Sequence, residues 1–116
     1  MTITLPFPPS VNTYWRRRGS QYFVCKKGMA YRASVIAAVW SLGKPKPSTE
    51  RLKVWIEATV PDRRKRDLDN IVKAILDSLQ HAGVYESDSQ IDDLRVIRGG
   101  VCEYKEGSIV VMIEPM

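Results

Sequence analysis

The sequence predicts an α+β fold, with a mixed β-sheet packed against two α-helices in a single domain over residues 1–116. The stretch Leu52–Val60 alternates apolar and polar residues, which is the period of a strand with one buried face. Two other stretches, Met29–Leu42 and Leu68–Ala82, repeat apolar residues at helical spacing. With 116 residues, 44% of them hydrophobic, the chain is long enough for one hydrophobic core and short for two.

The N-terminal elements are expected to be short and interrupted by prolines. Thr2–Leu5 is expected to form a strand that ends at Pro6, because proline lacks the N–H that a strand interior needs. Pro8–Asn12 should then form an irregular loop. We expect Gln21–Cys25 to form a strand and Lys26–Gly28 to form the turn that follows it.

Glycines mark the expected ends of the two helices. Gly43 follows the first helix and Gly83 follows the second, which is the usual position of glycine at a helix C-terminus. Two strands are expected to close the chain, roughly Asp93–Cys102 and Ser108–Glu114, joined by a turn at Lys105–Gly107. The sequence contains no internal repeat and no low-complexity segment.

The charge of the chain is unevenly distributed. The formal net charge is +5, but residues 1–61 hold ten Lys/Arg and two acids, whereas residues 62–93 hold eight acids and five bases. A basic surface around a local group of carboxylates suits a polyanionic substrate brought to a cation-binding centre. Ordinary solvated surface charge explains the same counts equally well.

Several classes of protein and site are disfavoured. The longest uncharged apolar run, Ala33–Gly43, is too short to cross a bilayer, and no stretch resembles a secretory signal, so we expect a cytoplasmic protein without a membrane partner. Cys25 and Cys102 lack the spacing of a zinc site or a disulfide framework, and we expect two buried thiols. The single histidine, His81, needs no functional role. No organic cofactor is expected.

Acidic residues gather where a basic loop becomes the second helix. One helix cap requires fewer polar side chains than the three present here, Asp67, Asp69 and Asn70. The two aspartates are two residues apart, so an extended entry would aim both carboxylates the same way, and Lys73 lies one helical turn beyond Asp69. Helix capping together with pairing to Arg66 is an equally good interpretation.

A close pair of carboxylates requires neutralisation. At a separation of about 4 Å they repel by roughly 4 kcal/mol at an effective dielectric constant of 20. Near neutral pH a cation meets this need better than a proton. Ligands that are all oxygen favour Mg²⁺ or Mn²⁺ over zinc, and Mg²⁺ commonly shares one or two carboxylates with water and phosphate.

Basic and aromatic residues suggest where DNA could bind. The candidates form two groups, one in the loop before the second helix and one after the N-terminal proline loop. They are Arg63, Arg64, Lys65 and Arg66, and Asn12, Tyr14, Arg16 and Arg17. On charge alone, a solvated loop is the simpler explanation of the first group. For Tyr14 and Trp15, core packing is at least as good an explanation as stacking on bases.

Three segments together resemble the signature of the RusA family of Holliday-junction resolvases. They are Pro61–Lys73, Gly83–Tyr85 and Asp88–Ile91. The opening Ile3–Asn12 is similar to the N-terminus of the same family, so the resemblance spans most of the chain. It implies an endodeoxyribonuclease that depends on Mg²⁺, resolves four-way junctions by paired nicks in DNA recombination and repair, and acts as a symmetric homodimer.

The resemblance also implies roles for individual residues. Asp67, Asp69 and Asp88 match the acids that form the Mg²⁺ centre of the family, with Mn²⁺ as a possible substitute, and Lys73 matches a lysine needed for cleavage. Family members can have two adjacent acids at the third position, whereas Ser87 precedes Asp88 here, so Glu86 is not assigned. Roles for Asp77, Asp92 and Asp93 also stay open.

Two alternative functions remain at this point. One is a non-catalytic, structure-selective DNA-binding protein whose acids cap a helix and balance arginines. The other is a small nuclease that acts on other branched nucleic acids. Dependence on a metal separates the first alternative from a nuclease, and competition among substrates separates the second.

Overall fold

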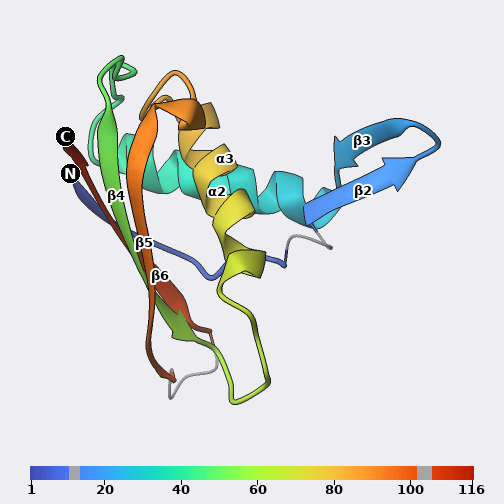
Figure 1. Cartoon of the computed structure of the whole chain (residues 1–116). Helices are drawn as coiled ribbons and strands as arrows, with labels where there is room; N and C mark the ends of the chain where they lie inside the picture. The colour runs from blue at the N-terminus through green and yellow to red at the C-terminus, as the bar shows by residue number, and fades with distance from the viewer. Residues whose placement is uncertain (11–13, 102–105) are drawn as a thin grey trace.

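A four-stranded mixed sheet forms one layer of the structure, and two helices lie together on one side of it (Figure 1). The computed structural model describes residues 1–10, 14–101 and 106–116. The strand order is β1-β6-β4-β5, in which only the β4–β5 pair is parallel. The bounds are β1 Thr2–Leu5, β4 Leu52–Val60, β5 Ile91–Val101, β6 Ser108–Pro115, α2 Lys26–Ser41 and α3 Asp69–His81. The predicted α+β class and mixed sheet are confirmed.

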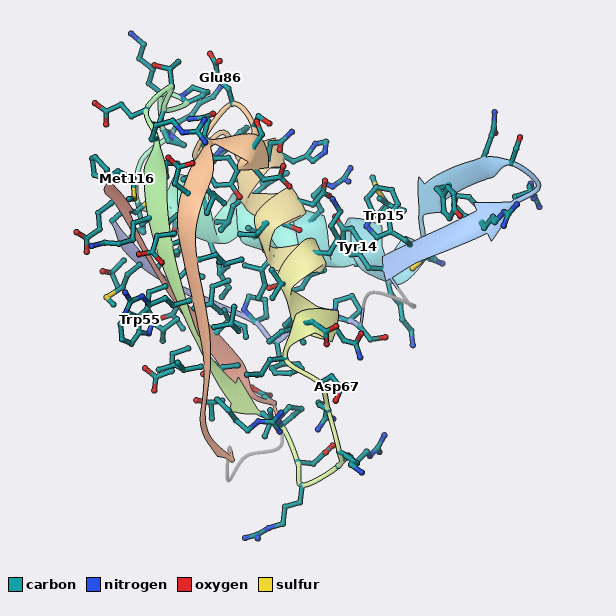
Figure 2. The ribbon with its side chains drawn as sticks, viewed as in Figure 1. Tyr14, Trp15, Trp55, Asp67, Glu86 and Met116 are labelled. Carbon is teal, nitrogen blue, oxygen red and sulfur yellow. The ribbon has the colours of Figure 1, made fainter. Side chains whose placement is uncertain are left out.

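The central strand β4 shows why the sheet has one buried face. Its residues Leu52, Val54, Ile56, Ala58 and Val60 are all buried beneath the helices, as the alternating pattern predicts. The intervening side chains lie on the opposite face of the sheet, where Figure 2 shows Trp55 pointing away from the helices. The core between the sheet and helices α2 and α3 therefore forms from one face of each element.

The connection from β4 to β5 determines where the candidate residues lie. Parallel neighbours require a crossover, and α3 provides it by running back along the sheet between the end of β4 and the start of β5 (Figure 1). The N-terminus of α3 consequently lies near the end of β4. Its C-terminus lies near the start of both strands, where Leu52 is paired with Ile91.

The expected turn at Lys26–Gly28 is wrong, because these residues form the first turn of α2. Cys25 caps the helix, and its Sγ accepts a hydrogen bond from the Gly28 backbone N–H at 3.4 Å. Gly28 is buried so tightly that a Cβ would lie 2.6 Å from Cγ1 of Val24. Glycine is therefore present for close packing at this position. Cys25, expected to be buried, is half-buried, and Cys102 lies outside the described residues.

A separate hairpin precedes α2. Strand β2 (Trp15–Arg18) pairs with β3 (Gln21–Val24), and the two do not join the main sheet. The predicted strand Gln21–Cys25 is confirmed to within one residue, whereas β2 was not predicted. A short 3-10 helix, η1 (Asp88–Gln90), leads into β5, which begins two residues earlier than expected. None of the described helices is both long and apolar enough to cross a membrane.

Candidate active site

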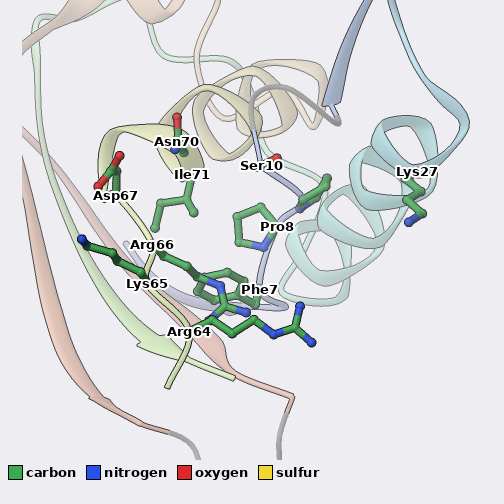
Figure 3. Close-up of a pocket in the computed structure, with 11 residues that line it drawn as sticks. Phe7, Pro8, Ser10, Lys27, Arg64, Lys65, Arg66, Asp67, Asn70 and Ile71 are labelled. Carbon is green, nitrogen blue, oxygen red and sulfur yellow. The ribbon is translucent and has the colours of Figure 1, made fainter. Parts of the chain in front are cut away.

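A cleft of about 960 Å³ opens between the N-terminal loop, the start of α2 and the loop that precedes α3 (Figure 3). Four basic residues and one aspartate contribute to its walls, and the remaining residues are mainly proline, aromatic or aliphatic. The charged members are Lys27, Arg64, Lys65, Arg66 and Asp67. A concave surface of this sign can accommodate a phosphate backbone. Residues Phe7–Ser10 and Lys27, which line the cleft, were not assigned to a site from the sequence.

Asp67 and Asp69 lie at the start of α3 with exposed side chains. The residue at the N-cap position is Leu68, and no side chain among the described residues forms a capping hydrogen bond there. Neither carboxylate forms a hydrogen bond or ion pair with any residue that the structure describes. Capping and pairing with Arg66, the alternative interpretation of these aspartates, are therefore not what the structure shows. Among the described residues, nothing prevents either carboxylate from binding a ligand.

Arg66 instead holds the loop together. Its guanidinium donates to both carboxylate oxygens of Asp62, at 2.6 and 3.0 Å. The hydrogen bonds from Arg66, with a backbone bond from Arg64, lower the pKa of Asp62 to about 2. Arg66 also lies 5.7 Å from the centre of the Phe7 ring, and its carbonyl accepts a bond of 2.5 Å from Arg98. The loop is thereby fixed, with Asp67 at its end.

Lys73 is exposed one turn after Asp69 on α3. Its Nζ lies 5.9 Å from the centre of the Trp15 ring, within the range of a cation–π contact. Trp15 is the first residue of β2 and packs partly against the core. The hairpin thus contacts the lysine that the resemblance assigns to cleavage. Sequence reasoning missed this contact, because nothing in the spacing of the two residues indicates it.

Asp88 lies at the other end of α3. Its backbone N–H donates to Oε1 of Gln80 at 3.0 Å, and Gln80 is eleven residues beyond Asp69. Eleven residues of helix span roughly 16 Å. Figure 2 shows Asp67 near one end of α3 and Glu86, two residues before Asp88, near the other end. Asp88 therefore cannot share a metal ion with Asp67 and Asp69 of the same chain.

The described residues of one chain contain no group of three or more His, Cys, Asp or Glu side chains that could hold a metal ion. The three aspartates that match the metal centre of the family are therefore not brought together within one protomer, and their shared centre stays a prediction. The physical reason is the parallel crossover, which carries Asp88 to the opposite end of the sheet from Asp67. Within one protomer, the structure keeps Asp67, Asp69 and Lys73 at one end of α3.

Tyr14 is fully buried, so it cannot stack on bases, and core packing is the interpretation that the structure supports. Its hydroxyl donates to the carboxylate of Asp77, which also pairs with Arg32 at 2.7 Å. Burial alone would raise the pKa of Asp77, but the bonds from Tyr14 and Arg32 outweigh it and lower that pKa. Asp77 therefore joins α2 and α3 to the residue that precedes the hairpin, and its carboxylate is occupied by Tyr14 and Arg32.

The remaining candidates are dispersed. Asp92 pairs with Arg51, and Asp93 pairs with Arg95 at 3.5 Å, which accounts for both acids as surface ion pairs. Glu86 is exposed at the same end of α3 as Asp88. Arg17, Arg63, Arg64 and Lys65 are exposed. Asn12 and the side chain of Arg16 lie outside the described residues.

The chain matches the family model "Endodeoxyribonuclease RusA" over residues 6–114. It is 56% identical over 97 residues to a crossover junction endodeoxyribonuclease of Enterobacteria phage HK97, which covers 84% of this chain and 81% of the relative. A protein of the same name from Escherichia coli strain K12 is 42% identical over 101 residues, with 84% and 81% covered. One from Enterobacteria phage 82 is 40% identical over 100 residues, with 83% and 80% covered. The chain belongs to the RusA family of endodeoxyribonucleases.

Proposed function

We propose that this chain is an endodeoxyribonuclease that depends on Mg²⁺ and resolves four-way DNA junctions by paired nicks, acting in DNA recombination and repair. The observation that carries the proposal is the pair of exposed carboxylates, Asp67 and Asp69, beside a basic cleft. The names of the relatives, which describe them as acting at crossover junctions, support the choice of substrate.

The donor atoms at the start of α3 fit a hard divalent cation. Asp67 and Asp69 offer only oxygen ligands, and neither carboxylate is occupied by a described residue. Mg²⁺ typically takes one or two carboxylates and completes its shell with water and phosphate oxygens, and Mn²⁺ accepts the same ligands. A bound ion would supply Lewis-acid stabilisation of the scissile phosphate and activation of the attacking water.

The other residues bind and orient the substrate. Lys73 carries its charge one turn from Asp69, where it would offset negative charge that develops on the phosphate during in-line attack. Lys27, Arg64 and Lys65 line the cleft and would contact neighbouring phosphates. The expected products carry a 5′-phosphate and a 3′-hydroxyl.

A homodimer would supply the missing aspartate. In such a dimer, α3 would pack antiparallel against α3 of the partner, about a two-fold axis near the middle of the helix. The start of each α3 would then lie beside the end of the other. The partner's Asp88 would then lie beside Asp67 and Asp69 of the first copy. Such a dimer contains two equivalent sites, matching a four-way junction that must be nicked on two strands. This arrangement reconciles the three matched aspartates with their separation in one protomer.

The function is tested with a labelled four-way junction incubated with the purified protein, in Mg²⁺ or in chelator. We expect paired cuts near the branch point with Mg²⁺ and intact junction with chelator. Linear duplex and branched RNA of the same length serve as competitors. If the protein binds junctions but does not cut them with any divalent metal, the proposal is contradicted and a structure-selective binding protein is favoured. Preferential cutting of RNA would favour a nuclease of another class.

The basic loop gives a quantitative test of DNA contact. We expect the double variant Arg63→Gln/Lys65→Gln to weaken junction binding and to reduce the slope of log affinity against log salt by about 2, one for each lost phosphate contact. Both side chains are exposed, so the fold should be unaffected. Fluorescence anisotropy over a range of salt concentrations measures the slope.

The matched control removes the same charge elsewhere. Lys44 and Lys46 are exposed beyond the C-terminus of α2, whereas the cleft lies at its N-terminus. Lys44→Gln/Lys46→Gln should leave most of the slope intact. Equal losses for the two double variants would show that binding depends on net charge alone and would contradict a specific role of the loop.

A further inference from the structure

The β2–β3 hairpin projects away from the sheet and the helices (Figure 1). Its strands pair only with each other, and an isolated hairpin is marginally stable in water. The chain contains no acidic residue before Glu50, so every charged side chain of the hairpin and of the start of α2 is basic. A projecting basic ribbon of this kind suits contact with a polyanion.

The two faces of the hairpin differ. Cross-strand partners lie on the same face, so Trp15 and Val24 share one face with Arg17 and Tyr22. Trp15 contacts Lys73 at the base of the hairpin, and Arg17 follows it two residues farther out, about 7 Å away. This face therefore runs outward from the candidate catalytic lysine. Phe23 alternates with Tyr22 and lies on the opposite face.

Tyr22 is the most exposed large aromatic residue of the described chain, at 67%. The guanidinium of Arg17 lies 5.8 Å from the centre of its ring. Arg17 is itself held by a hydrogen bond of 2.6 Å from its Nε to the carbonyl of Gly19 in the hairpin turn. The hairpin thus presents an aromatic ring and a guanidinium side by side to solvent, in a position that contributes little to the core.

We propose that Tyr22, with Arg17 beside it, forms a stacking platform for a nucleotide displaced from the duplex at a branch point. The proposal rests on the proposed function and deepens it. An aromatic ring gains stacking energy only from a base whose face is available, and an intact duplex hides those faces inside its stack. Arg17 supplies the positive charge for the adjoining phosphate. The platform would lie near the strand held at Lys73, and it would favour branched DNA over linear duplex.

Three variants test the platform. Tyr22→Ala should lower junction affinity about 10-fold, the expected loss for one stacked base, while leaving affinity for linear duplex unchanged. Tyr22→Phe keeps the ring and should bind like the unaltered protein. Phe23→Ala is the matched control, because Phe23 is also exposed, at 46%, on the other face of the same hairpin. A junction carrying 2-aminopurine at the branch point reports base unstacking by fluorescence.

The outcomes separate the platform from the proposed function. If the unaltered protein cuts junctions with Mg²⁺ but Tyr22→Ala keeps the same junction-to-duplex affinity ratio and fluorescence change, the platform is overturned and the nuclease stands. An equal loss for Phe23→Ala would overturn the assignment to Tyr22. If the unaltered protein does not cut junctions, the proposed function itself fails. Thermal melting of each variant verifies that the fold is retained.

Discussion

Asp69→Asn is expected to reduce junction cutting by more than about 100-fold. Removing a residue that only supports a metal ligand costs up to about 100-fold, and Asp69 is proposed as a ligand itself. Asparagine keeps the size of the side chain but removes the negative charge that attracts a divalent cation. Because Asp69 is exposed and unpaired among the described residues, the change should alter stability by no more than about 0.5 kcal/mol. Junction binding should persist, because the carboxylate of Asp69 repels the DNA phosphates and its removal does not weaken their binding.

Gel-shift and cleavage assays on the same protein preparation check this result. Glu57→Gln is the matched control, because Glu57 is also exposed but lies on the face of β4 opposite the helices. It should cut at the rate of the unaltered protein. An Asp69→Asn enzyme with undiminished cutting would remove Asp69 from the active site, and loss of binding together with cutting would assign it a role in DNA affinity.

The elements of the core could be predicted because each has a strong local pattern. Strand β4 alternates over its whole length, and α3 places Ile71, Ile75 and Leu79 on one buried stripe. The start of α2 could not be predicted in this way. It depends on the capping contact of Cys25 and on Gly28 packing against Tyr14, which comes from an earlier part of the chain. Tertiary contacts of this kind override a local turn signal.

The candidate site was predictable in part. The resemblance and the local surplus of acids both pointed to Asp67 and Asp69, and the structure leaves their carboxylates free of the described residues. The position of Asp88 relative to Asp67 and Asp69 could not be predicted, because the sequence does not show how the chain runs after the helix that separates them. The helical crossover between parallel strands takes it to the far end of α3. Trp15 beside Lys73 likewise depends on the folded chain.

A mixed-dimer experiment has the second large expected effect. Asp69→Asn and Asp88→Asn proteins should each be inactive alone. If every site takes Asp67 and Asp69 from one copy and Asp88 from its partner, a mixed dimer has one site with both changes and one site with neither. Co-expression with two affinity tags isolates this dimer. Its substrate is a supercoiled plasmid with an extruded cruciform, which paired nicks make linear and a single nick makes open-circular.

The mixture of Asp67→Asn with Asp69→Asn is the control, because both changes fall at the same end of α3 and no intact site can form in either arrangement. The central claim is that a divalent ion is held between the two copies by aspartates from opposite ends of α3. It predicts that the Asp69→Asn/Asp88→Asn mixed dimer nicks the plasmid to the open circle without making it linear, while the control dimer stays inactive. A purified mixed dimer that leaves the plasmid supercoiled would contradict it.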